Sequence, residues 1–409
     1  MDNVQQEVDR LYKSHFGKMV STLLYFSRDI DLDTAEDLVQ DSFSAALVAW
    51  RKDGVPANPA GWIFTVCKNK ALNKIREGKR FRNLFQEEAT PPRDPAILPG
   101  AFDDYQLRLL FACAHPHLSP KVQVVITLKY VVNLKVEAIA KILAMTVDGV
   151  DKLLLRARQK IREEKILFEE AGEEAIKTRI TIVHKIIYLI FNEGYKTSWG
   201  KELVREELCE EALLLDRALL NSKIGNQETA ALYALMLFNA ARFKARFGPS
   251  GELLDLEEQD RSLWDPELIR LACHYLDQSR GGPASSYHYE AAIAYLHCTA
   301  GSFAATEWPA ISRLYHQLLQ LHPNPFVELN YAIALYYAGQ KAPAFETLNG
   351  LLEHPFLSQY YLLNAALGKL HFLEGDLAAA KKYWEKTLRQ TSSPAEKDFI
   401  QKMIDKAMR

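Results

Sequence analysis

Cationic side chains gather on one predicted helix near the middle of the chain. Lys152, Arg156 and Arg158 lie there at helical spacing, and Lys160 and Arg162 continue the same helix. Ammonium and guanidinium groups clustered in this way bind phosphate oxygens, and their binding to nucleic acid releases condensed counterions. These residues therefore indicate recognition of a polyanion. The alternative is an ordinary helical hairpin whose charged face is only solvated.

The segment that positions these cations, residues 135–162, reads as two short helices joined by a tight turn. The first helix places apolar residues at helical spacing: Val136, Ile139, Ala140, Ile142 and Leu143. Ala144 and Met145 break it, and Thr146 can accept hydrogen bonds from the backbone N–H groups that open the second helix. We expect that helix to turn inward Val147, Val150, Leu153, Leu154 and Ala157. This is a helix-turn-helix, whose second helix fits the major groove of DNA.

A second polar surface is expected on two helices nearer the N-terminus. The helix that opens at Asp33 carries a strip of polar and acidic side chains: Glu36, Asp37, Gln40 and Asp41. The helix over 60–80 aligns Trp62, Val66, Asn69, Asn73, Arg76 and Arg80, with Lys68 beside them. Aromatic rings next to cations suit single-stranded DNA, which binds by stacking and phosphate attraction.

Residues typical of enzymes and metal sites are few. Cys113, His115 and His117 supply three potential metal ligands, but one short cluster without a distant partner is weak evidence for zinc, and a helix start broken by proline explains it equally well. No phosphate-binding glycine loop, nucleophile elbow or HExxH motif appears. We therefore expect no metal, no cofactor and no catalytic residue, and a protein that is not an enzyme.

Length and composition indicate a multidomain globular protein. The 409 residues are 48% hydrophobic and 25% charged, and no apolar run approaches the ~20 residues that span a bilayer. The polar N-terminus is unlike a signal peptide, and the five cysteines are scattered, so we expect a cytoplasmic protein. Residues 1–165 hold 25 Lys and Arg against 21 Asp and Glu, whereas residues 166–409 hold 25 against 31. The first part is therefore basic and the second acidic.

The apolar pattern has a helical period almost throughout, which predicts an all-α fold. We expect a helical domain over 9–82, a proline-rich linker over 83–102, a helix-turn-helix domain over 103–165 and an acidic helical extension over 166–409. Within about 290–409 a weak repeat recurs, with Gly339 and Gly375 at matching turns 36 residues apart. This period is similar to that of tetratricopeptide repeats, whose stacked helices form a surface for protein partners. An irregular bundle is the alternative.

Taken together, these segments resemble a known family. The blocks AEDLVQDSFSAAL and GWIFTVCKNKALNKIR, the proline-rich linker and the final LLLRARQKIR resemble bacterial extracytoplasmic-function (ECF) sigma factors of the sigma-70 family. The first two blocks look like sigma region 2 and the last like region 4. The stretches FACAHPHLS, YLIFNEGY and LEEQDRSLWD are similar to those of a subgroup with a long tetratricopeptide-like C-terminal extension.

The resemblance implies specific roles. Glu36, Asp37, Gln40 and Asp41 match the surface that docks on the clamp helices of the largest subunit of core RNA polymerase. The residues that match the reader of the minus-ten promoter element are Trp62, Lys68, Asn69, Asn73, Arg76 and Arg80. Those that match the reader of the minus-thirty-five element are Thr146, Lys152, Arg156 and Arg158. Asn73 stands where these proteins commonly have Asp, which leaves its role as support or contact open.

The expected function is that of an RNA polymerase sigma factor in promoter-specific transcription initiation, with core polymerase and promoter DNA as partners. The extension would regulate or support this activity, through an intramolecular contact or a protein partner. The alternative is a sigma-like DNA-binding regulator or scaffold that does not join polymerase. An acidic stretch from Glu252 to Asp265 could be either an ion network that packs domains or a contact surface for regulation.

Overall fold

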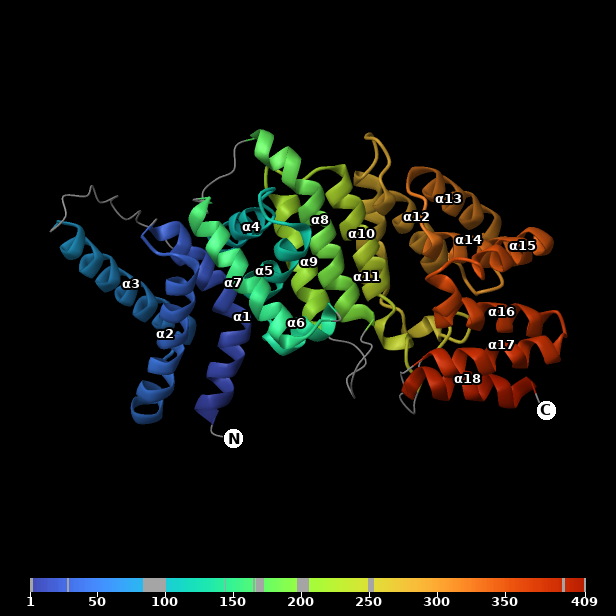
Figure 1. Ribbon diagram of the computed structural model, residues 1–409, viewed down its shortest axis with the longest axis horizontal. Coiled ribbons are helices and arrows are strands. Elements are labelled where there is room, and N and C mark those ends of the chain that lie inside the picture. The colour runs from blue at the N-terminus through green and yellow to red at the C-terminus, as the bar shows by residue number, and fades with distance from the viewer. Residues whose placement is uncertain are drawn as a thin grey trace. The chain divides into compact units, whose positions relative to one another are not determined.

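The computed structural model describes residues 3–27, 29–83, 101–143, 145–164, 166, 173–196, 206–248, 254–391 and 394–407 (Figure 1). Regular structure in these ranges is helical, which confirms the all-α prediction. None of the helices in the described ranges is both long and apolar enough to cross a bilayer. The chain divides into two compact units, Met1–Glu193 with Glu210–Ile224 and Gly194–Cys209 with Gly225–Arg409.

The first unit begins with three long helices: α1 (Asn3–Phe26), α2 (Leu32–Asp53) and α3 (Pro59–Asn83). Asp31 caps α2, because its carboxylate accepts from the Thr34 backbone N–H at 2.9 Å. Gly54 ends this helix with φ +83°, a left-handed conformation that glycine adopts without strain. The buried stripe of α2 includes Val39, Phe43, Ala46 and Trp50, and fixes which face of the helix stays polar.

The helix-turn-helix follows in the same unit. Its elements are α4 (Ala101–Cys113), α5 (Pro120–Ile126), the single π-helical turn η1 (Thr127–Val131), α6 (Val136–Ile142) and α7 (Val147–Glu163). The Thr146 hydroxyl accepts from the Gly149 backbone N–H at 3.1 Å, as its predicted capping role requires. Most of the linker expected over 83–102, residues 84–100, lies outside the described residues.

One expectation about α7 is wrong. Val147 is 44% exposed, whereas Val150, Leu154, Ala157 and Ile161 form the buried stripe. Val147 is the first residue of α7, and the buried stripe of the helix begins one turn later, at Val150.

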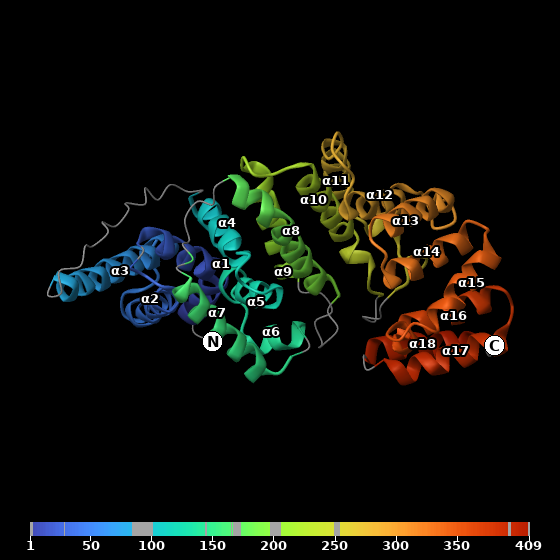
Figure 2. The same ribbon diagram turned by 45° about the horizontal axis from the view of Figure 1, so that its top comes forward.

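Helix α1 joins the two halves of this unit. It packs against α2 and α3 on the N-terminal side, and against α4 and η1 of the helix-turn-helix half (Figure 2). At the crossing with η1, a Cβ on Gly17 would stand 2.5 Å from the Val131 carbonyl oxygen. The two backbones therefore approach as closely as only a glycine permits.

Beyond residue 165 the first unit includes most of α8 (Glu173–Lys196), up to Glu193, and most of α9 (Glu206–Asn221), from Glu210 onward. The Gln106 amide of α4 donates to the Glu211 carboxylate of α9 at 2.6 Å. The Arg179 guanidinium of α8 donates to the Phe111 backbone oxygen at 3.1 Å. The start of the acidic extension is thus packed on the helix-turn-helix half.

The second unit is built from helices in succession. They are α10 (Gln227–Ala240), α11 (Pro266–Gln278), α12 (Ser286–Thr299), α13 (Trp308–Leu321), α14 (Pro325–Tyr337), α15 (Lys341–Leu351), α16 (Tyr361–Leu373), α17 (Leu377–Gln390) and α18 (Pro394–Ala407), with short 3-10 turns η2 (Phe243–Ala245), η3 (Arg261–Leu263) and η4 (Leu357–Gln359).

Consecutive helices of the second unit pack against each other. Gly339 and Gly375 adopt φ +84° and +80° in the turns before α15 and α17, so the glycines that marked matching turns in the sequence do occupy equivalent turns. Ala344 and Ala380 are fully buried on the helices that follow. The helical pairing fits the repeat hypothesis, and a tetratricopeptide-like assignment stays a prediction.

Candidate functional site

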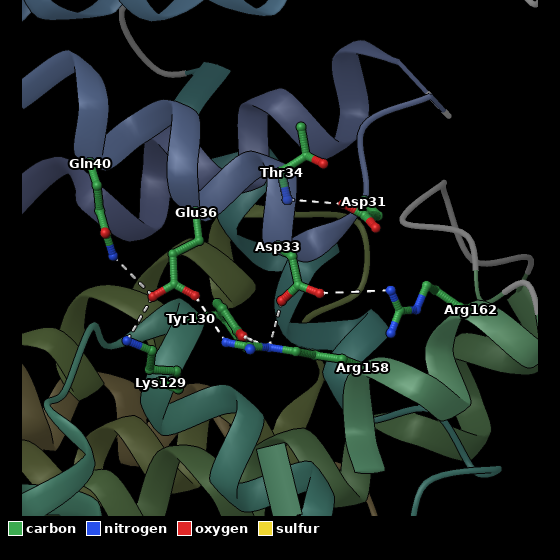
Figure 3. A network of polar contacts seen from close by, with 9 residues as sticks. All are labelled: Asp31, Asp33, Thr34, Glu36, Gln40, Lys129, Tyr130, Arg158 and Arg162. Carbon is green, nitrogen blue, oxygen red and sulfur yellow. Dashed lines mark hydrogen bonds and ion pairs between the residues drawn. The ribbon is translucent and has the colours of Figure 1, made fainter. Parts of the chain in front are cut away.

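A polar network joins α2 to the helix-turn-helix half of the first unit, and Glu36 lies at its centre (Figure 3). One carboxylate oxygen of Glu36 pairs with the Lys129 ammonium of η1 at 2.8 Å and accepts from the Gln40 amide at 3.2 Å. The other oxygen accepts from Arg158 of α7 at 3.1 Å. Of the four residues on the predicted polymerase-docking strip, Glu36 is therefore bound by the rest of the chain.

Arg158 is held on several sides. Its Nε group lies 2.8 Å from the Asp33 carboxylate and donates to the Tyr130 hydroxyl at 2.7 Å. Arg162, one turn further along α7, lies at 4.0 Å from the other oxygen of Asp33 (Figure 3). The network thus links two acidic side chains of α2 with cations from η1 and α7.

The charged groups of this network are largely shielded from solvent. The side chains of Glu36 and Lys129 are 10% and 16% exposed, and that of Arg158 is 27% exposed. Desolvation lowers the pKa of Arg158, but Tyr130, Asp33 and Glu36 together raise it above its ordinary value. Burial is also the main cause that raises the pKa of the Tyr130 phenol. Arg158 is therefore a permanent cation among acceptors.

The remaining residues of the docking strip face solvent. Asp37, Gln40 and Asp41 are all exposed on α2. Asp41 lies 3.6 Å from Lys70 of α3, a loose pair whose carboxylate is 67% exposed. An exposed pair of this kind is weak and exchanges readily with other partners. The two carboxylates are available for contact with another macromolecule, and Gln40 is exposed beside them although its amide donates to Glu36.

The predicted minus-ten reading residues lie on α3. Trp62 is half-buried and packs edge-on against Trp50 of α2, with ring centroids 5.6 Å apart. Asn69, Asn73 and Arg76 are exposed, and Lys68 is half-buried. The side chain of Arg80 lies outside the described residues. Helix α3 thus presents amide and cationic groups on the C-terminal side of Trp62, whose indole packs against α2.

The predicted minus-thirty-five residues differ in how free they are. Arg156 is exposed on α7. Lys152 is also exposed, and it pairs with Asp148 one turn earlier at 2.7 Å. Thr146 is exposed and serves as the helix cap. Arg158 is the exception, because the network with Glu36 and Asp33 occupies its guanidinium.

Comparison with known proteins decides the family. Residues 11–81 match the family model for sigma-70 region 2, and residues 108–161 match that for sigma-70 region 4. Residues 11–81 cover α1 to α3, and residues 108–161 run from α4 to α7. The chain belongs to the ECF group of the sigma-70 family. Residues 179–280 of this sigma factor match a family of unknown function (DUF6596), and this match lies within the long C-terminal extension.

Similarity to one relative of this sigma factor extends over nearly the whole chain, and similarity to another extends over part of it. An uncharacterized protein of Rhizobium meliloti (strain 1021) is 32% identical over 409 residues, covering 97% of this chain and 95% of that protein. The ECF RNA polymerase sigma factor SigG of Mycobacterium tuberculosis is 28% identical over an alignment of 155 positions, which covers 32% of this chain and 42% of SigG. No solved structure matches.

The Cys113, His115 and His117 cluster of the sigma factor is spread over different environments. Burial raises the pKa of the Cys113 thiol to about 12. His117 instead lies 3.2 Å from the Glu164 carboxylate. Among the described residues, no group of three or more His, Cys, Asp and Glu side chains could hold a metal ion.

The Glu252–Asp265 stretch makes contacts of a structural kind where it is described. Asp265 caps α11 by accepting from two backbone N–H groups, and Glu257 pairs with Lys369 of α16 at 3.1 Å. Arg261 donates to the carbonyl oxygens of His297 and Ala300 at 2.7 and 2.8 Å, near the end of α12. These contacts fit the packing alternative. Glu252 itself lies outside the described residues.

Proposed function

We propose that this sigma factor binds core RNA polymerase through the acidic strip of α2 and directs it to promoters. The observation that carries the docking proposal is the exposure of Asp37, Gln40 and Asp41 together on one face of α2. Carboxylates at the surface attract basic side chains of a partner and speed the encounter. The partner surface would be the clamp helices of the largest polymerase subunit. The chain would act as a specificity subunit without chemistry of its own.

Promoter recognition would use two helices. The exposed amides and cations of α3, with Trp62 at its N-terminal end, would open and read the minus-ten element. The α7 helix, entered at Thr146, would lie in the major groove at the minus-thirty-five element, where Lys152, Arg156 and Arg158 contact phosphates or base edges.

The C-terminal extension would regulate or support this activity. Its first helices, α8 and α9, support α4 through the Gln106–Glu211 and Arg179–Phe111 contacts. The helices of the second unit would offer a surface to a protein partner or make an intramolecular contact.

Charge reversal at the exposed strip tests the docking proposal. We expect the double variant Asp37→Lys with Asp41→Lys to lose core polymerase binding by at least about 100-fold, because two attractions become repulsions at one interface. Helix content and melting temperature should stay close to wild type, since both side chains are exposed. Glu137→Lys on α6, an exposed acidic residue outside the strip, is the matched control. Binding retained by the double variant would reject this face and leave the DNA-binding regulator as the better description.

A further inference from the structure

The polar network around Glu36 engages two surfaces that the sigma factor needs for different partners. Glu36 belongs to the docking strip for polymerase, and Arg158 belongs to the α7 helix that would read DNA. In the structure each is the partner of the other. A Glu36 carboxylate held by Lys129 and Arg158 is not available to a basic side chain of polymerase, and an Arg158 guanidinium held by Asp33 and Glu36 is not available to a phosphate.

The carboxylates of α2 occupy Arg158 much as phosphates would. Two acidic side chains, Asp33 and Glu36, approach one guanidinium at 2.8 and 3.1 Å, and Asp33 also reaches toward Arg162. Guanidinium groups bind carboxylate and phosphate oxygens with the same donor geometry. The carboxylates of Asp33 and Glu36 therefore occupy the Arg158 guanidinium in place of the phosphates of DNA.

Backbone contacts fix the same arrangement independently of the charges. Gly17 of α1 lies against the Val131 and Tyr130 carbonyl oxygens, where a Cβ would come within 2.5 and 2.9 Å of them. The Asn133 amide, on a residue with φ +60°, donates to the Tyr12 carbonyl oxygen at 3.3 Å. A left-handed conformation is uncommon for a residue other than glycine, so the turn after η1 is held by its surroundings.

Solvent can reach one edge of the contact between Glu36, Lys129 and Arg158. A hollow of about 380 Å³ lies beside it, lined by Glu36, Lys129, Arg158 and residues of α6 and α7, among them the exposed Leu155. The ion pairs are thus largely buried but not sealed, which suits a contact that must open.

We propose that this contact is an in-chain latch, by which regions 2 and 4 of the sigma factor hold each other in a closed state that must open before core polymerase binds fully. The inference rests on the proposed function, because it takes the α2 strip to be the docking face. It places an inhibitory device inside the sigma half itself. Apparent affinity for polymerase is then the affinity of the open state reduced by the fraction of molecules that are open.

The test weakens the latch at positions outside both proposed binding faces. Lys129→Met removes one cation from Glu36, and Gly17→Ala forces α1 away from η1 without changing any charge. The matched controls are Lys121→Met, on an exposed residue of α5, and Gly350→Ala, on a helical glycine of α15 with open space around its Cβ position. All are made in the full chain, and the dissociation constant for bacterial core RNA polymerase is measured for each.

We expect both latch variants to bind core polymerase about tenfold more tightly than wild type, and both controls to match wild type. A distance measurement checks the mechanism and remains valid if one variant folds poorly. Donor and acceptor dyes are placed on cysteines introduced at the exposed Lys74 of α3 and Gln159 of α7, with Cys273 changed to Ser because the other four native cysteines are buried. Energy transfer should fall when wild type binds core polymerase, and should already be lower in the free latch variants.

The outcomes separate the two proposals. If wild type binds core polymerase but the latch variants bind no more tightly, or if energy transfer is unchanged in the polymerase complex, the latch is rejected and the docking proposal stands. If neither wild type nor any variant binds core polymerase, the docking proposal fails and the latch falls with it.

Discussion

At the scale of single residues, Glu36 and Asp41 show how burial separates similar ion pairs. Both are acidic residues of α2 that face a lysine, but the Glu36–Lys129 pair is largely buried at 2.8 Å, whereas the Asp41–Lys70 pair is exposed at 3.6 Å. Exposed pairs contribute about 0–1 kcal/mol, while removal of one partner from a buried pair costs about 3–5 kcal/mol. The buried pair therefore constrains the structure, and the exposed pair leaves its carboxylate open to a partner.

The same contrast on α7 gives a prediction for DNA binding. Arg156 is exposed, so Arg156→Ala should remove a phosphate or base contact without disturbing the latch. We expect binding to promoter DNA to weaken by about 1–3 kcal/mol, and the slope of log affinity against log salt to become shallower by about one for a phosphate contact. A salt titration of DNA binding by full-length protein with core polymerase measures both.

Lys177→Ala is the control for Arg156→Ala, because Lys177 is an exposed cation of α8, outside the helix-turn-helix. It should leave the affinity nearly unchanged. An Arg156→Ala variant with the salt slope of wild type would remove Arg156 from the phosphate contacts.

At the scale of helices, much of the fold follows from local sequence. The Thr146 cap, the glycines at 339 and 375 and the apolar stripe of α7 depend on residues a few positions apart, so their spacing predicts them. The latch could not be predicted in that way. Glu36 and Arg158 are 122 residues apart in the sequence, and each is a charged residue of a type that usually lies at the surface. Their contact depends on the packing of α1 against both region 2 and region 4. The spacing of apolar residues along a helix does not encode that packing.

Helix α9 contains a feature that its sequence pattern conceals. Asp216 is fully buried, and within the described part of the chain neither of its carboxylate oxygens has a hydrogen-bond partner. Burial raises the pKa of this carboxyl well above its ordinary value. The folded protein therefore keeps the proton at pH values where the unfolded chain has lost it, and stability falls as pH rises from the ordinary pKa of Asp toward the raised one.

Replacing Asp216 with Asn tests this assignment. Asp216→Asn keeps the shape but cannot ionise, so its free energy of unfolding should exceed that of wild type increasingly with pH. The difference should grow by about 1.4 kcal/mol per pH unit between the ordinary and the raised pKa, and vanish in slope below the ordinary pKa. Urea unfolding from pH 3.5 to 8 measures it. Exposed Asp148→Asn is the control, and parallel curves for Asp216→Asn and wild type would contradict a raised pKa.

At the scale of the whole molecule, the sigma half and the extension do not divide at the end of region 4. The first compact unit includes Glu210–Ile224, and α8 and α9 contact α4. A chain cut after residue 165 would lose these contacts and expose the faces that they cover. A chain of residues 1–224 keeps them, together with the latch between α2, η1 and α7.

This division leads to a prediction about truncation. Because the latch lies within the first unit, we expect residues 1–224 to bind core polymerase no more than about threefold more tightly than the full chain, and to gain about tenfold when Gly17→Ala is added. Residues 1–165 should melt at a lower temperature than residues 1–224, since Gln106 and Arg179 anchor that contact. If residues 1–224 bind core polymerase tenfold or more tightly than the full chain without any substitution, the second unit itself restrains the sigma factor. The extension would then act as an inhibitor in the same chain, and the latch would be at most an accessory to it.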